Sequence, residues 1–202
     1  MKINSNTVFV VTGGASGLGE AVIRNITSHG GKCICFDMNN ELGNKLVNEL
    51  GGDNVYFHNV NVVDEKSVQD GLSSGVSHFN LGLSGVVNCA GIGNPCKVIG
   101  KNNVSHPLNI FNQVVQVNLI GTFNVLRLAA PIMSQSSGQG DEKGIIINVA
   151  SVAAFDGQIG QAAYSASKAG VVGMTLPISR ELAQHGIRVN CMLTNLYVPL
   201  LT

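Results

Sequence analysis

The stretch TGGASGLG, residues 12–19, decides the fold of this chain. It follows an apolar, largely β-branched run, residues 7–11, which predicts a buried parallel strand. It also opens a predicted helix over residues 17–29. Its glycines let the backbone turn tightly and approach a pyrophosphate, whose negative charge the helix N-terminus stabilises. A glycine triplet alone is weak, but strand, turn and helix together are the context that a dinucleotide-binding turn requires.

The rest of the chain repeats this alternation of strand and helix. The sequence predicts strands at residues 7–11, 32–36, 55–57, 83–89, 144–149 and 187–192. It predicts helices at residues 17–29, 39–50, 64–74, 107–133 and 161–185, the last kinked at Pro177, and no regular structure at residues 91–106. We therefore expect an α/β fold in which residues 1–202 form one domain, a doubly wound parallel sheet (Rossmann fold) with strand order 3-2-1-4-5-6.

Composition excludes several classes of function. The chain of 202 residues is 45% hydrophobic and 12% charged, which argues against disorder. Its formal net charge is zero, so no basic surface indicates contact with nucleic acid. No purely apolar run reaches the roughly 18 residues that span a membrane, and the histidines show no metal-ligand spacing. Five scattered cysteines are typical of a reducing compartment, and Cys33 and Cys35 fit a buried strand.

An aspartate at the end of the second predicted strand indicates which dinucleotide binds. Asp37 lies 18 residues after Gly19, where a carboxylate can accept both hydrogen bonds of an adenosine ribose. The same carboxylate repels a 2′-phosphate, and neither Ser16 nor Met38 supplies a cation to hold one. The sequence therefore favours NAD over NADP, although Asp37 could also be a plain loop cap.

Two further features lie near the predicted carboxyl edge of the sheet. The tetrapeptide NCAG, residues 88–91, ends the fourth strand, and its small residues let the backbone lie against a ribose or adenine. A simple strand-to-loop turn is the alternative. Asn118 lies among apolar neighbours in a predicted helix and must find hydrogen-bond partners. It either holds a water molecule beside Lys168 or is satisfied by backbone groups.

The segment SVAAFDGQIGQAAYSASK, residues 151–168, indicates the chemistry. Tyr164 and Lys168 are four residues apart, so they share a helix face, and the ammonium favours the phenolate over the phenol. Of the three tyrosines, only Tyr164 is followed by lysine at this spacing. Ser151 ends the preceding strand and could hydrogen-bond the oxygen to which the tyrosine gives its proton. The segment predicts a site that interconverts alcohol and carbonyl with a hydride carrier.

Together these residues resemble the short-chain dehydrogenase/reductase family over nearly the whole chain. The resemblance implies that Tyr164 is the general acid/base, that Ser151 polarises the substrate oxygen, and that Lys168 supports the phenolate and binds the nicotinamide ribose. It implies that Asn118 anchors a proton-relay water. The cofactor-binding residues it implies, besides Tyr164 and Lys168, are Gly13, Ser16, Gly17, Leu18, Gly19, Asp37, Asn61, Val62, Asn88, Cys89, Ala90 and Gly91.

The run over residues 146–182 is particularly similar to family members that act on 3-hydroxyacyl-CoA and hydroxysteroid substrates. The resemblance thus implies NAD-dependent, reversible oxidation of a secondary alcohol and a role in lipid metabolism. It also implies a homotetramer and a mitochondrial location, although the sequence shows no cleavable presequence and the protein is otherwise expected in the cytoplasm. The chain has Thr194-Asn195 in place of the family's Pro-Gly, and it stops where members usually continue into a substrate-covering segment and a seventh strand. A protein that binds NAD but serves as a scaffold or interaction subunit is the alternative.

Overall fold

The computed structural model describes residues 1–195 and contains one six-stranded parallel sheet. Its strand order, β3-β2-β1-β4-β5-β6, confirms the predicted doubly wound topology. The strands are β1 (Val8–Thr12), β2 (Lys32–Asp37), β3 (Val55–Asn59), β4 (Leu83–Asn88), β5 (Gly144–Ser151) and β6 (Ile187–Thr194). The helices are α1 (Gly17–Ser28), α2 (Asn40–Leu50), α3 (Glu65–Phe79), α4 (Leu108–Val115), α5 (Thr122–Ser134) and α6 (Ala162–Ala183).

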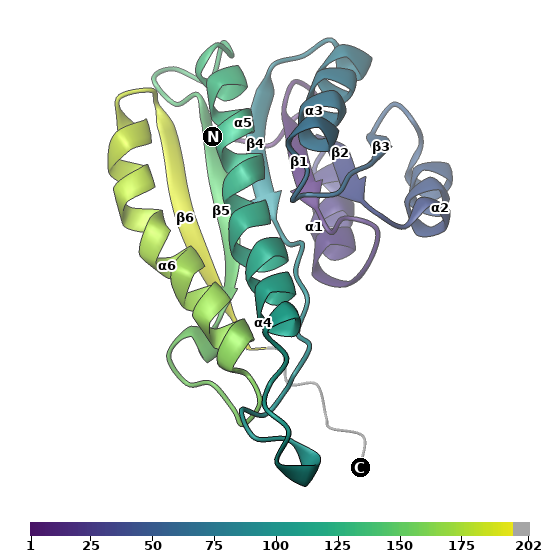
Figure 1. The fold of residues 1–202 in the computed structure, drawn as a ribbon. Coiled ribbons are helices and arrows are strands. Elements are labelled where there is room, and N and C mark those ends of the chain that lie inside the picture. Colours follow the sequence, from purple (N-terminus) through teal and green to yellow (C-terminus); the bar gives the residue numbers. More distant parts are fainter. Residues whose placement is uncertain (196–202) are drawn as a thin grey trace.

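Helices pack on both faces of the sheet, as Figure 1 shows. Residues of α1 and α2, such as Ile23 and Leu46, form one core with alternate side chains of β1 and β2. Residues of α3, α5 and α6, such as Leu72 and Val125, form a second core on the opposite face. Cys35 is fully buried in the first core, as the sequence predicts. Strands β1 and β2 are buried on both faces and read as nearly continuous apolar runs, whereas β6 alternates buried residues with exposed ones such as Arg188 and Asn190.

Two predicted helix starts are confirmed at the level of individual hydrogen bonds. The Asn39 side chain accepts a bond from the Leu42 amide at 3.0 Å and caps α2. Asp64 does the same for the Ser67 amide at 2.9 Å and caps α3. Such caps can be read from sequence because donor and acceptor are only three residues apart.

Other element boundaries differ from the predicted ones. Helix α3 runs five residues beyond its predicted end at residue 74 and stops at Asn80, which has φ +50°. Gly75, just beyond the predicted end, lies within the helix and packs against the buried Ile34 side chain. In the loop after β4, predicted to lack regular structure, the chain forms a short 3₁₀ turn at Lys101–Asn103. Helix α6 continues past Pro177 as one element.

The helix predicted at residues 107–133 is continuous but not uniformly α-helical. A π-helical segment, Gln116–Gly121, joins α4 to α5. The combined helix, residues 108–134, is by length and composition apolar enough to cross a membrane, yet half of its most apolar window is buried within the protein. In Figure 1 it lies along the sheet, as a core helix does.

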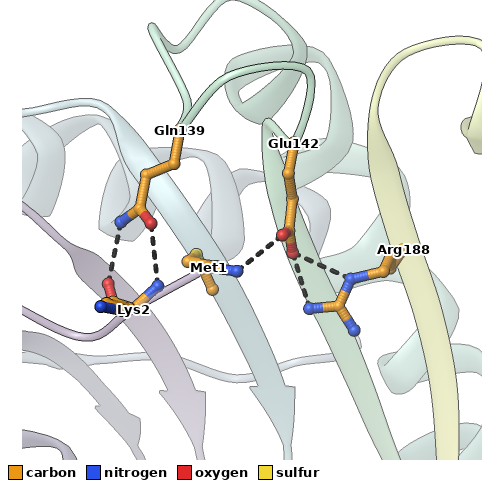
Figure 2. A network of polar contacts seen from close by, with 5 residues as sticks. All are labelled: Met1, Lys2, Gln139, Glu142 and Arg188. Atoms are coloured by element: carbon orange, nitrogen blue, oxygen red, sulfur yellow. Dashed lines mark hydrogen bonds and ion pairs between the residues drawn. The ribbon is translucent and has the colours of Figure 1, made fainter.

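A polar network joins the first residues to the loop before β5 and to β6, at the end of the sheet opposite the glycine turn (Figure 2). The Met1 ammonium donates to Glu142 Oε2 at 2.7 Å, and Arg188 donates to Glu142 Oε1 from Nε at 2.8 Å and Nη2 at 2.6 Å. The Gln139 amide exchanges two bonds with the Lys2 backbone, both 2.8 Å long. The ammonium and the guanidinium lower the pKa of Glu142.

We expect Glu142→Gln to lower the unfolding free energy by about 1 kcal/mol at pH 7, or about 2–4 °C in Tm. Because the folded-state pKa lies below the unfolded-state value, the stabilisation is present above an ordinary value of about 4.5 and is lost as pH falls through the folded-state pKa. Thermal melts of both proteins from pH 7 to pH 3 should therefore converge at low pH. The more exposed pair Glu65–Arg127 provides the control, Glu65→Gln, for which we expect a smaller shift.

Candidate active site

The carboxyl ends of the strands meet at one edge of the sheet and gather the predicted site residues there. Thr12 at the end of β1 pairs in register with Asn88 of β4, and Ser151 at the end of β5 pairs with Thr194 of β6. The glycine turn, NCAG and the segment after Ser151 therefore leave the sheet at the same edge. The Thr12 hydroxyl links the end of β1 to the NCAG segment by accepting a hydrogen bond from the Ala90 amide at 3.0 Å.

The glycine turn is built around two positions that exclude a side chain. A Cβ on Gly19 would lie 2.1 Å from the Gly13 carbonyl oxygen, so the start of α1 rests directly on the turn. Gly13 has φ +62°, and a Cβ there would lie 3.0 Å from the Ala90 backbone. This close packing leaves a bare backbone beside the start of α1, which is the surface that a pyrophosphate needs.

A cavity of about 460 Å³ extends from the glycine turn to the ends of β2 and β3. It is lined by Gly13, Ser16, Gly17, Leu18, Gly19, Phe36, Asp37, Met38, Val60, Asn61, Val62, Cys89, Ala90, Gly91, Ile92 and Val117. The Asp37 carboxylate accepts bonds from the Ala15 amide at 3.1 Å and the Asn39 amide at 3.0 Å. Asp37 is thus both a loop cap and part of the cavity wall, so the two interpretations of this residue are compatible.

A second cavity of about 320 Å³ contains the predicted catalytic residues Ser151, Tyr164 and Lys168. It is also lined by Leu18, Cys89, Gly91, Ile92, Gly93, Pro95, Val149, Ala150, Val152, Ala153, Asp156, Gln158, Gln161, Thr194 and Asn195. Four residues line both cavities: Leu18, Cys89, Gly91 and Ile92. The two cavities are therefore adjacent parts of one cleft along the sheet edge.

Ser151 and Tyr164 enter this cavity from different elements. Ser151 is the last residue of β5, is 6% exposed, and its Oγ accepts a bond from the Ala153 amide at 3.2 Å. Tyr164 lies in the first turn of α6 and is half-buried. The short segment between β5 and α6 turns the chain back so that strand end and helix start share a cavity, as the sequence predicts.

Lys168 lies at the floor of the cavity and is 5% exposed. Its Nζ donates to the Val149 carbonyl at 2.7 Å and lies 5.7 Å from the centroid of the Tyr164 ring. Burial lowers the pKa of Lys168. Burial also raises the pKa of the neighbouring Cys89 thiol to about 11, so this thiol is uncharged at neutral pH. A buried cation beside the phenol ring is the arrangement expected to support a phenolate.

Asn118 lies in the π-helical segment and is fully buried. Its Nδ2 donates to the Ile92 carbonyl at 2.9 Å and to Ser167 Oγ at 3.0 Å, and its Oδ1 accepts from the Ile92 amide at 2.8 Å. The side chain is therefore satisfied by protein groups, the second of the two alternatives. Gly91 lies close to both Asn118 and Lys168, since a Cβ on Gly91 would lie 3.2 Å from Asn118 Oδ1 and 3.6 Å from Lys168 Nζ.

We expect Gly91→Ala to slow turnover about tenfold or more, because the methyl group would occupy the space between Asn118 and Lys168. NAD binding should weaken less, because the φ of Gly91 is not positive and alanine therefore does not strain the backbone that lines the cavity. Steady-state kinetics and a calorimetric titration with NAD separate the two effects. Gly173→Ala on α6 is the control, because a Cβ there meets nothing within 4 Å and Gly173 lines neither cavity. Equal kinetics for the two variants would contradict the prediction.

Asn88 lies outside the lining of both cavities, although it belongs to the predicted cofactor-binding set. It is 2% exposed, and its Nδ2 donates to Asn148 Oδ1 at 2.9 Å, joining neighbouring residues of β4 and β5. The Asn88 side chain therefore links β4 to β5 where NCAG begins and does not face the cleft. The other predicted residues line one cavity or both, except Asn118, which lies behind the wall.

The sequence-based prediction missed two residues that help to build the site. Ile92 lines both cavities, and its backbone holds the Asn118 amide. Ser167 lies buried behind Tyr164 and Lys168. No local signal marks Ile92, whereas a serine enclosed between the tyrosine and the lysine could have suggested Ser167. The family resemblance also aligns Val198 loosely with a threonine that meets the nicotinamide carboxamide, and Val198 lies outside the described residues.

Residues 1–195 contain no group of three or more potential metal ligands. The polar groups that line the cleft are hydroxyl, side-chain amide, ammonium, thiol and backbone groups, together with the carboxylates of Asp37 and Asp156. This set suits a dinucleotide and an alcohol or ketone.

Comparison with known proteins points to one family. The short chain dehydrogenase family model matches residues 7–197. The 3-hydroxyacyl-CoA dehydrogenase type-2 of Rattus norvegicus is 49% identical over 198 residues, covering 96% of this chain and 75% of its own length. The protein of the same name from Drosophila melanogaster is 49% identical over 186 residues, covering 91% and 72%. The crystal structure of 3-hydroxyacyl-CoA dehydrogenase type-2 from Mycobacterium avium superposes with a TM-score of 0.89 at 33% identity, covering 96% and 76%.

Proposed function

The chain belongs to the short-chain dehydrogenase family, and from this premise we propose that it is an NAD-dependent oxidoreductase that interconverts a secondary alcohol and a ketone. The substrate we propose first is a 3-hydroxyacyl-CoA, and a hydroxysteroid is the second. The observation that supports this most directly is the placement of Ser151, Tyr164 and Lys168 in one cavity that continues to the glycine turn.

The residues of the cavity have distinct roles in the proposed oxidation. The Ser151 hydroxyl donates a hydrogen bond to the substrate oxygen and holds it near Tyr164. The Tyr164 phenolate takes the proton from the substrate hydroxyl, and the buried Lys168 ammonium stabilises the phenolate. Tyr164 and Lys168 would hold the nicotinamide ribose, and a bound NAD would supply the acceptor for the hydride that leaves the carbinol carbon. In the reverse direction Tyr164 returns its proton to the carbonyl oxygen.

The residues present fit an NAD molecule along the cleft. The start of α1 and the bare backbone at Gly13 and Gly19 suit the pyrophosphate. Asp37 lines the same cavity, where its carboxylate would accept hydrogen bonds from the adenosine ribose. The Asp37 carboxylate would repel a 2′-phosphate, which supports NAD as the cofactor in preference to NADP.

We expect Asp37→Asn to weaken NAD binding about tenfold, because a charge-assisted hydrogen bond to a ribose hydroxyl contributes about 1.5 kcal/mol. Binding of NADP should improve in the same variant, since the repulsion is removed. The amide oxygen can accept from only one of the Ala15 and Asn39 amides, so thermal melts are needed beside the titrations to detect a change in the loop. Calorimetric Kd values for both dinucleotides test this, with Asp70→Asn on α3 as the control. Unchanged selectivity would contradict the assignment of Asp37.

The surface around the second cavity supports a substrate with an apolar part. The segment that links β5 to α6 exposes Phe155 and Ile159, which are 73% and 84% exposed. The Cys96 amide donates to the Gly160 carbonyl at 2.8 Å, so the loop after β4, with exposed Val98, lies beside this segment. Two apolar loops at the mouth of a cleft suit an acyl chain or a steroid better than a small polar alcohol.

The direct test is NADH formation by the purified protein with 3-hydroxyacyl-CoA, hydroxysteroid and simple secondary alcohols. We expect turnover with the first class, and more weakly with the second. Binding of NAD without turnover on any of them would favour the alternative of a scaffold that binds the dinucleotide. Failure to gain thermal stability with NAD would contradict both, because a ligand that binds only the folded state raises its stability.

The homotetramer and the mitochondrial location are further proposals that rest on the family resemblance. Equilibrium sedimentation of the purified protein and imaging of a C-terminally tagged protein would test them.

A further inference from the structure

One buried hydroxyl connects the catalytic helix to the wall of the cleft. Ser167 lies in α6 between Tyr164 and Lys168 and is 0% exposed. Its Oγ donates to the Tyr164 carbonyl at 2.7 Å and accepts a bond from Asn118 Nδ2 at 3.0 Å. The hydroxyl is therefore fixed from both sides, with its proton directed to one partner and a lone pair to the other.

The Asn118 amide carries the connection to the loop after β4. Its second Nδ2 hydrogen goes to the Ile92 carbonyl, and its Oδ1 receives the Ile92 amide. Both Nδ2 hydrogens of Asn118 are thus used, one on the loop and one on Ser167. Ile92 lines both cavities of the cleft. A continuous chain of hydrogen bonds therefore runs from the cleft wall to the backbone of the tyrosine.

The π-helical segment makes this chain possible. Gln116–Gly121 interrupts the α-helical repeat between α4 and α5 and packs against α6. One extra residue in a helical turn rotates the side chains that follow, which is why such turns are frequent at functional sites. Here the segment contains Asn118, whose side chain is directed at both Ile92 and Ser167.

An ordinary structural role is the simpler alternative for Ser167. Helix serines and threonines commonly bond back to a carbonyl three or four residues earlier. Thr175, on the same helix, does so to the Val171 carbonyl at 2.8 Å. Ser167 differs because its hydroxyl also accepts from a side chain of another element, and because the carbonyl it holds belongs to Tyr164.

We propose that Ser167 is a positioning residue for the reaction proposed above: it fixes the Tyr164 backbone relative to the cleft wall through Asn118 and Ile92. The proposal rests on the proposed function. In Ser167→Ala the Tyr164 carbonyl and one Asn118 hydrogen each lose a partner, so the phenol and the loop can shift independently. A displacement of about 1 Å at a reacting group can cost about a hundredfold in rate.

The test compares Ser167→Ala with Thr175→Ala, which removes a back-bonding hydroxyl from the same helix outside the network. Kinetics with NAD and 3-hydroxybutyryl-CoA should show kcat reduced about tenfold or more in Ser167→Ala, with KM for both substrates nearly unchanged. Hydrogen exchange at the Ile92 amide should be faster in Ser167→Ala and unchanged in Thr175→Ala, because Asn118 would hold Ile92 less firmly.

Each other outcome would overturn the proposal. Wild-type kcat in Ser167→Ala, or an equal loss in Thr175→Ala, would show that Ser167 has no special role. Loss of folding in Ser167→Ala alone would assign the residue to stability. If the wild-type protein gives no turnover, the proposed function fails. Hydrogen exchange then still tests the link from Ser167 through Asn118 to Ile92, because an unchanged exchange rate at the Ile92 amide in Ser167→Ala would disprove it.

Discussion

Tyr164→Phe is expected to lower kcat by about 10²–10⁴-fold while leaving NAD affinity nearly unchanged. The substitution removes one oxygen from the cavity that also contains Ser151 and Lys168, and general acid/base transfer typically contributes a factor of this size. The ring remains, so the packing of α6 and the surroundings of Lys168 Nζ, 5.7 Å from the ring centroid, are preserved. Steady-state turnover and calorimetric NAD binding measure the two quantities separately.

The matched control is Tyr56→Phe. Tyr56 lies on β3, at the far edge of the sheet, and its hydroxyl is 3.4 Å from His58 Nδ1. Removing this hydroxyl should leave turnover unchanged. Full activity in Tyr164→Phe would remove the proposed mechanism, and a parallel loss of NAD binding would indicate that the variant disturbs the cleft as a whole.

Lys168→Met is expected to separate activity from stability. Turnover should fall at least about a hundredfold, because the phenolate loses the cation that stabilises it. Thermal stability should not fall, since replacing a buried charge by an apolar side chain of similar length removes the cost of desolvation. That cost is the cause of the lowered pKa of Lys168. The loss of the hydrogen bond from Nζ to the Val149 carbonyl lowers stability, but by less, because only one neutral acceptor loses its partner.

Kinetics and thermal melts of Lys168→Met test both parts together. Lys45→Met on α2, where the lysine is exposed, is the control for loss of a positive charge. A fall in Tm that accounts for the loss of activity would show that Lys168 serves the fold and not the reaction.

Local patterns in the sequence explain the parts of the fold that could be predicted. The caps Asn39 and Asp64 act over three residues, and the inner strands β1 and β2 are apolar runs because helices cover both of their faces. The strand order was predicted as that of a Rossmann fold, which the alternation of strands and helices and the dinucleotide-binding turn indicated. The end of α3 was predicted wrongly, because Gly75 packs on Ile34 and this contact is long-range.

The amino-acid sequence by itself determined the glycine turn and the candidate catalytic residues, because each depends on spacing along one strand, turn or helix. It indicated the sheet order through the alternation of strands and helices around that turn. Only the tertiary structure decided that Asn88 faces β5 and not the cleft, that Asn118 holds the Ile92 backbone, and that Ser167 joins Asn118 to Tyr164. These bonds link residues 26 to 60 positions apart, except the last. A buried polar side chain must find partners, but which partner it finds depends on which elements pack against it.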